Sequence, residues 1–152
     1  MIFRSDEVAA ARSTVYSVMA PTPQYAWPLL RERLGMKVWV KHENHTATGA
    51  FKLRGGLTYF SALALSGAGA RGVISATRGN HGQSVGFAAR KYGMAATIVV
   101  PQGNSLEKNS AMHSLGVTLI EHGEDFQAAR EHAIALARRD GLHMVPSFHR
   151  DL

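Results

Sequence analysis

The chain has 152 residues, 45% of them hydrophobic, which is enough for one domain with a buried core. It has no cysteine, so disulfide bonds and thiolate metal sites are excluded, and it has no run of eighteen apolar residues that would predict a membrane span. The formal charge of +6 comes from lysines and arginines spread along the sequence. A nucleic-acid interface needs such residues clustered, so neither a nucleic acid nor a membrane is an expected partner.

The first third of the chain predicts two helices separated by a turn, and then a strand. The helices are expected at 6–18 and 27–34, the turn at 21–23 and the strand at 37–41. The N-terminus carries acidic residues and lacks the continuous apolar core of a signal peptide, so we expect a cytoplasmic protein. After a further helix that starts at Lys52, the segment 61–72 is the most loop-like stretch of the chain.

Strands and helices alternate from residue 72 onward. The strands are expected at 72–75, 96–100, 117–120 and 142–145, and the helices at 81–92, 106–115 and 124–139. This alternation implies right-handed crossovers, and hence an α/β fold with a parallel sheet and flanking helices. The chain stops just after the last strand without a closing helix. Because parallel sheets normally have both faces covered, we expect a fragment.

Two motifs in the sequence argue against familiar kinds of site. A literal GxGxxG occurs at Gly67, Gly69 and Gly72, but it precedes a strand instead of following one, which is the wrong order for a dinucleotide site. His42 and His45 are three residues apart, and two histidines alone do not complete a metal site. No metal is expected.

Two other segments carry candidate chemistry, TGAFKLRGG at 48–56 and SATRGNHGQS at 75–84. The first places Lys52 at the start of a helix, where the unpaired N–H groups normally favour acidic residues. The second lies on a strand-to-helix turn, where main-chain N–H groups form a cradle for an anion. Taken singly, Lys52 could be a surface lysine and the turn a simple connection. Together they suit an aldehyde cofactor and a substrate carboxylate, since the helix start and Arg54 would favour the neutral, nucleophilic amine.

The segments ENHTATGAFKLRGG and ATRGNHGQS resemble the two signature segments of the fold-type II pyridoxal-phosphate enzymes, most closely the threonine/serine dehydratase branch that includes serine racemase. The resemblance extends over nearly the whole chain, including IVVPQGNSLEKNSAMHSLGVTLIEHG. It implies the architecture of the tryptophan synthase beta-like fold. It also implies that residues 1–54 belong to a large cofactor-binding domain, whose remainder is absent, and that residues 55–152 form a small α/β domain.

The resemblance also implies roles for individual residues. Lys52 would form the Schiff base with pyridoxal 5'-phosphate and later remove the Cα proton of the substrate. Phe51 would pack against the pyridine ring, and Asn80 would bond the phenolic oxygen of the cofactor. The substrate carboxylate would be held around Thr77, Gly79 and His81.

The reaction that the resemblance implies is elimination from a β-hydroxy amino acid such as threonine or serine. Loss of the hydroxyl leaves an aminoacrylate that hydrolyses to a keto acid and ammonia. The full-length enzyme would be a homo-oligomer. Two alternatives stay open: another fold-type II enzyme, such as a synthase that replaces the β-substituent, and a non-catalytic α/β module.

The sequence departs from the family pattern in two places. Arg78 stands where dehydratases commonly have serine or alanine, and where serine racemase has a serine that handles a proton. A guanidinium is unsuited to proton transfer, so racemisation is not expected, and Arg78 either pairs with a substrate carboxylate or points to solvent. The glycine-rich phosphate cup of the family is also missing, so the fragment is expected to be inactive alone.

Overall fold

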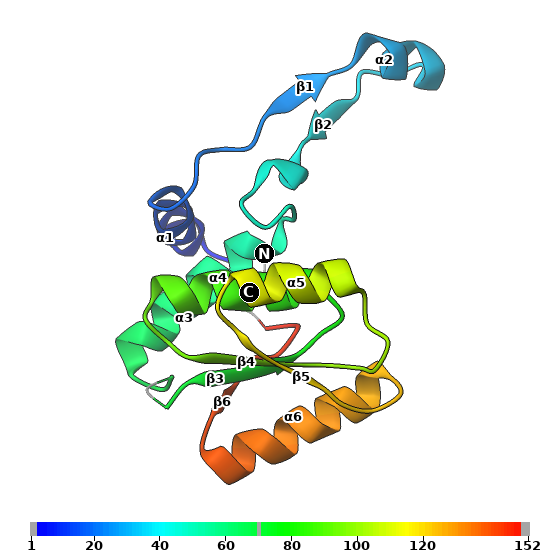
Figure 1. Cartoon of the computed structure of the whole chain (residues 1–152). Coiled ribbons are helices and arrows are strands. Elements are labelled where there is room, and N and C mark those ends of the chain that lie inside the picture. Colours follow the sequence, from blue (N-terminus) through cyan, green and yellow to red (C-terminus); the bar gives the residue numbers. More distant parts are fainter. Residues whose placement is uncertain (1–2, 70, 150–152) are drawn as a thin grey trace.

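The computed structural model describes residues 3–69 and 71–149. They form an α/β unit, residues 52–149, and an arm, residues 20–50, which projects away from it (Figure 1). The helices are α1 (Ser5–Tyr16), α2 (Pro28–Leu34), the 3-10 helix η1 (Glu43–His45), α3 (Lys52–Ser66), α4 (Asn80–Lys91), α5 (Leu106–Ser114) and α6 (Phe126–Asp140). The strands are β1 (Gln24–Ala26), β2 (Trp39–Lys41), β3 (Val73–Ala76), β4 (Ala96–Val100), β5 (Thr118–Glu121) and β6 (His143–Met144).

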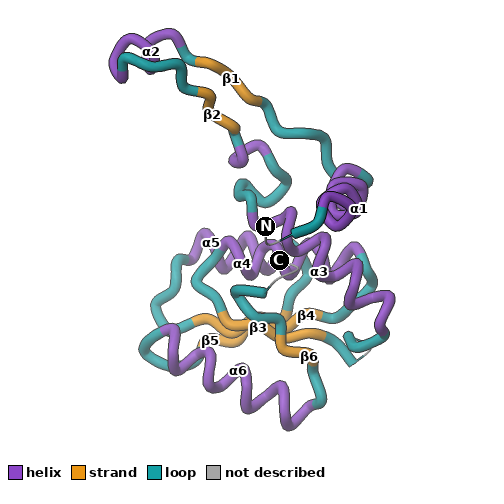
Figure 2. Tube along the Cα trace, turned by 180° about the vertical axis from the view of Figure 1, so that it is seen from behind, coloured by secondary structure: helices purple, strands orange, loops and turns teal. Residues whose placement is uncertain are grey.

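The main sheet has the strand order β5-β4-β3-β6, and all of its pairs are parallel. This confirms the predicted fold class. Helices α3, α4 and α5 cover one face of the sheet and α6 covers the other (Figures 1 and 2). Both faces of the described sheet are therefore covered. Helix α6 precedes the last strand and covers the second face, so this face is covered without a helix after β6.

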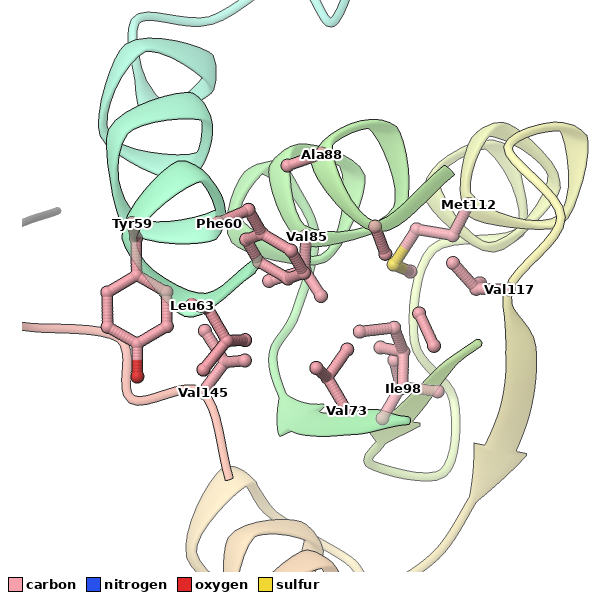
Figure 3. Packing of buried hydrophobic residues seen from close by; sticks show 13 residues of the cluster. Tyr59, Phe60, Leu63, Val73, Val85, Ala88, Ile98, Met112, Val117 and Val145 are labelled. Atoms are coloured by element: carbon pink, nitrogen blue, oxygen red, sulfur yellow. The ribbon is translucent and has the colours of Figure 1, made fainter. Parts of the chain in front are cut away.

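Each face of the sheet is packed by its own set of apolar side chains. On the first face, Phe60 of α3, Val85 of α4 and Met112 of α5 meet Ile98 of β4 (Figure 3). On the second face, small side chains of α6 pack against β3 and β4. Strands β3 and β4 are buried almost throughout, as expected for central strands of a parallel sheet.

The prediction of a loop at 61–72 is wrong in its first half, because α3 continues to Ser66. Alanine and leucine fill this stretch, and both favour helix strongly. The helix ends where Gly67 adopts a positive φ of 71°, which places a left-handed residue directly after the last turn. Strand β1 was not expected from the sequence either.

The arm consists of β1 and β2, paired antiparallel, with α2 between them at its far end (Figure 2). Its base is tied to the α/β unit through Arg54 of α3, which binds both Glu43 of η1 and Thr22. Beside this contact, α1 packs on α3. Among the described residues, no helix has the length and apolar character needed to cross a membrane.

Candidate active site

Lys52 is the first residue of α3, as its place in the sequence predicted. Its side chain is half-buried, and its Nζ lies 3.4 Å from the main-chain oxygen of Ser147 and 5.4 Å from the centre of the Phe148 ring. Ser147 and Phe148 follow β6, so a segment far away in sequence closes around the amine. In the described part of the chain, no carboxylate forms an ion pair with Lys52.

The turn 77–81 leads from β3 into α4. Thr77 is buried and its hydroxyl accepts a hydrogen bond from the N–H of Gly79, 3.0 Å away. Gly79 is the N-cap of α4 and no acidic residue stands in the first turn of that helix. The side chains of Arg78 and Asn80 are exposed. The start of α4 thus offers main-chain N–H groups without a side-chain acceptor from its own first turn, an arrangement that suits an anion.

Helices α3 and α4, whose starts carry these two segments, pack against each other (Figure 3). Their direct link is a hydrogen bond of 2.7 Å from the hydroxyl of Ser84 to the main-chain oxygen of Lys52. Asn80 lies one helical turn before Ser84, on the same face of α4. Lys52 and the turn 77–81 therefore lie at neighbouring helix starts.

The imidazole of His81 is buried beneath the turn. Its Nε2 lies 3.1 Å from the hydroxyl of Ser75, which donates a hydrogen bond of 2.7 Å to the main-chain oxygen of Val145. Burial, and secondarily the positive charge of Lys52, lower the pKa of His81 to about 4, so the ring is neutral at pH 7. The Nε2 of the ring is thus engaged by Ser75, while the main-chain N–H of His81 lies in the first turn of α4.

Arg54 does not lie free beside Lys52. Its guanidinium binds the carboxylate of Glu43 through Nε, at 2.8 Å, and through Nη2, at 3.0 Å. This pairing lowers the pKa of Glu43 and raises the pKa of Arg54, with the hydrogen bond between them as the largest cause of each shift. The charge of Arg54 is thus compensated, and its role in the structure is to hold the base of the arm.

The remaining residues singled out in the sequence are exposed. Phe51, the N-cap of α3, has 63% of its surface exposed, which leaves its ring free to meet a ligand. Arg78 makes no ion pair with any described residue. No group of three or more His, Cys, Asp or Glu side chains in residues 3–69 and 71–149 is arranged to hold a metal ion.

Comparison with known proteins shows the family to which the chain belongs. The model of one family, described as pyridoxal-phosphate dependent enzyme, matches residues 15–152. The chain belongs to this family. The family's cofactor is pyridoxal phosphate, and the parallel sheet with flanking helices is its fold.

Individual members of the pyridoxal-phosphate family support this assignment. The biosynthetic L-threonine dehydratase of Pasteurella multocida is 37% identical over 140 residues, which cover 92% of this chain and 27% of that protein. The processed form of threonine deaminase isoform 2 from Solanum lycopersicum superposes with a TM-score of 0.84 at 32% identity, over 98% of this chain and 45% of that one. Maize serine racemase, at 22% identity and a TM-score of 0.90, shares the fold. The chain spans about a quarter of the curated dehydratase and under half of the solved deaminase.

Several side chains around the candidate site were not singled out in the sequence. Ser147 and Phe148 touch the amine of Lys52, and their approach depends on tertiary structure that no local pattern reports. Lys108 of α5 lies over Gly79, where a Cβ would come within 2.5 Å of its Cδ. Ser84 was part of a quoted motif, but its partner is distant in sequence. The family signatures pointed to the two segments, while these contacts required the fold.

Proposed function

We propose that this chain supplies the lysine-bearing part of a pyridoxal-phosphate-dependent ammonia-lyase. The reaction is elimination from a β-hydroxy amino acid, such as threonine or serine, to a keto acid and ammonia. The observation that carries the proposal is the junction of two helix starts, where Lys52 of α3 and the turn 77–81 before α4 are joined by the Ser84 hydrogen bond. The names of the similar dehydratases support the reaction class.

The residues at this junction fit the cofactor chemically. Lys52 offers a primary amine, and no described carboxylate forms an ion pair with it that would stabilise the ammonium form. An aldehyde reacts with the unprotonated amine. The hydroxyl of Thr48, in the loop that leads to Lys52, is buried and has no hydrogen-bond partner, so a polar group remains to be satisfied close by in sequence. No described residue is assigned to the phosphate. We therefore expect the 152-residue chain alone to bind pyridoxal phosphate weakly and to be inactive.

The mechanism assigns each residue a task that its position allows. Pyridoxal phosphate, when bound, supplies the electron sink that makes the Cα–H bond of an amino acid acidic. The Nζ of Lys52 would hold the cofactor and is the group that would take the Cα proton of the substrate. Asn80 would donate a hydrogen bond to the phenolic oxygen of the cofactor, and Phe51 would pack along its ring. The N–H of Gly79 is engaged by the Thr77 hydroxyl, so the turn around Thr77 and Gly79 would shape the carboxylate site, and the main-chain N–H of His81 would be the donor that orients the substrate there.

Arg78 bears on the choice of reaction. It is exposed on the turn and has no acidic partner among the described residues. A guanidinium stays protonated at any working pH, so it cannot exchange a proton with Cα, and racemisation is not proposed. It can bind a carboxylate through two parallel hydrogen bonds. Arg78 is therefore assigned to the substrate, with a β-hydroxy amino acid as the class.

We further propose that residues 1–54 belong to a larger cofactor-binding domain and that residues 55–152 form the small domain. The exposed aromatic side chains of the arm support this division, since they find little cover within the described chain. Helix α3 runs unbroken across residues 54 and 55, so it would join the two domains rigidly. A homo-oligomer in the cytoplasm stays a prediction for the whole protein; two plant relatives are named chloroplastic.

The test of the cofactor assignment uses the chain itself. Excess pyridoxal phosphate is added, the product is reduced with borohydride, and labelled lysines are counted by peptide mass spectrometry. Labelling of Lys52 is expected to exceed that of Lys91, the exposed last residue of α4, by about tenfold or more. Equal labelling of the two would refute the assignment of Lys52.

The reaction itself is tested in a protein that carries this sequence at the length of the dehydratases. L-threonine and L-serine should both be converted to keto acids, and Lys52→Ala should abolish the visible absorbance of the bound cofactor, while Lys91→Ala should retain it. A keto acid from neither substrate would favour a β-replacement enzyme. Loss of cofactor binding as well would favour a non-catalytic module.

A further inference from the structure

The contact between α3 and α4 is made at one point by a serine and a glycine. Ser84 is 1% exposed and donates its hydroxyl hydrogen bond to the main-chain oxygen of Lys52, at 2.7 Å. A Cβ built on Gly56 would lie only 2.2 Å from the Ser84 hydroxyl oxygen and 3.2 Å from its main-chain oxygen. Only glycine at position 56 therefore lets the two helices come close enough for this hydrogen bond.

We propose that Ser84 is a positioning residue, which sets the place of the Lys52 amine relative to Asn80 by holding the first turn of α3 against α4. The proposal rests on the proposed role of Lys52. The oxygen that Ser84 binds belongs to Lys52 itself, so the bond fixes the backbone from which the amine extends. Asn80 lies four residues before Ser84 and on the same face of α4, within the turn 77–81. One hydroxyl thus connects the lysine with the helix that carries Asn80.

Nothing else in the described contacts makes this link at the start of α3. The amine itself has only a long contact of 3.4 Å to the oxygen of Ser147 and lies near the exposed ring of Phe148. The neighbouring Arg54 points instead to the base of the arm. The side chain of Lys52 is therefore held loosely, while its backbone is held firmly by Ser84. In such an arrangement the amine can move to react, while the backbone that carries it keeps its position.

The experiment measures the reactivity of Lys52 without and with the cofactor. Reductive methylation by formaldehyde is followed at Lys52 and Lys91 over a range of pH, in the wild-type chain, in Ser84→Ala and in Val117→Ala. The last variant truncates a buried side chain that packs against the middle of α4, at Gly86, and controls for general loosening. The cofactor measurement is the borohydride trapping described above.

In Ser84→Ala the first turn of α3 is expected to move from α4. Methylation of Lys52 relative to Lys91 should rise about threefold across the pH range, because the amine leaves its contacts with Ser147 and Phe148. The preference of pyridoxal phosphate for Lys52 should fall about tenfold. Val117→Ala should change neither quantity.

A substitution at Gly56 should displace the first turn of α3 in the same way and provides a second test. Gly56→Ala should change the Lys52 profile as Ser84→Ala does, and the double variant should be milder than the sum, because removal of the hydroxyl removes the closest clash. The proposal is overturned if Ser84→Ala leaves the Lys52 profile unchanged, or if Val117→Ala changes it equally. Failure of the proposed function looks different. In that case pyridoxal phosphate shows no preference for Lys52 in the wild-type chain, whatever formaldehyde reports.

Discussion

The α/β unit and the arm differ in how far each covers its own apolar side chains. In the unit, Phe60, Ile74 and Ile98 are completely buried. In the arm, Trp27 and Trp39 leave 45% and 55% of their surfaces exposed, although Trp27 packs edge-on against Tyr25. A parallel sheet with helices on both faces closes a core by itself, whereas a hairpin of two short strands cannot. The candidate site lies where the two regions meet. One side of it therefore belongs to a region with a closed core, and the other side to a region whose apolar side chains are partly exposed.

The comparison predicts its largest effect in the core of the unit. Phe60→Ala should lower the free energy of unfolding by about 3–5 kcal/mol, because it removes a fully buried ring between α3, α4 and the sheet. Trp27→Ala, a truncation of comparable size in the arm, should cost less than about 1.5 kcal/mol, since its main loss is an aromatic edge contact. Urea denaturation measures both. Equal costs would show that the arm is as tightly packed as the unit.

The next effect comes from the buried histidine under the turn. The pKa of His81 is lowered from 6.5 to about 4 in the folded chain, so between these values the unfolded state binds more protons. The folded state should therefore lose up to about 3 kcal/mol of stability as the pH falls from 7 to 4. His81→Asn should flatten this slope. His143, whose pKa burial also lowers, leaves a residual slope.

The control for this measurement is His113→Asn, at an exposed position on α5. It should leave the slope as it is in the wild type. An unaltered slope in His81→Asn would mean that the imidazole is not confined as the Ser75 hydrogen bond indicates. The measurement is the free energy of unfolding by urea at a series of pH values.

Substitutions at two glycines, one in each region, distinguish the cost of overpacking from the cost of an unfavourable backbone conformation. Gly82 of α4 is surrounded, and a Cβ there would lie 2.4 Å from the sulfur of Met112 and 2.6 Å from the methyl group of Thr77. Gly82→Ala should cost about 1–3 kcal/mol by overpacking and should displace Thr77. Gly35 in the arm has no neighbour within 4 Å but a φ of +67°.

Substitution at Gly35 is expected to act through the backbone alone. Gly35→Ala should cost roughly 1 kcal/mol, and Gly35→Asn less, since asparagine tolerates the left-handed region. Gly82→Asn should be worse than Gly82→Ala, because the larger side chain adds to the overlap. Thermal or urea unfolding of the four variants provides the test. The same order at both positions would contradict the distinction between a packed and an open site.

The sequence predicted the unit far better than the arm, and the reason is physical. From β3 onward, each strand is a short apolar run and each helix ends at a glycine or before a turn, so hydrophobic spacing reported the elements to within a few residues. The sequence underestimates helix α3 because the small residues before Gly67 have the composition of a loop. Strand β1 escaped because all of its residues are exposed and carry no burial pattern.

The candidate site was predictable as two segments but not as a set of contacts. The lysine motif and the turn after β3 were visible because their local chemistry is unusual. The burial of His81 against Ser75, and the engagement of Arg54 by Glu43, depend on residues between six and eleven positions away that fold back through tertiary structure. Local reasoning placed Arg54 beside the amine of Lys52, whereas its partner Glu43 draws it toward the arm.

The smallest predicted effect lies at that partner pair, which joins the arm to the unit. Glu43 and Arg54 are both about one-quarter exposed and are held by two hydrogen bonds, so a double-mutant cycle with Glu43→Gln and Arg54→Gln should give a coupling of about 1 kcal/mol at pH 7. The pKa of Glu43 is lowered by this pairing, so its contribution is complete above the ordinary glutamate pKa of 4.5 and is lost as the pH falls through the lower folded value. The exposed pair Arg139 and Asp140 serves as the control and should show no measurable coupling at physiological salt. If the coupling of Glu43 and Arg54 is equally absent, or persists in strong acid, the pair does not fasten the arm. Among the described residues, the packing of α1 on α3 would then be the contact that remains beside the base of the arm.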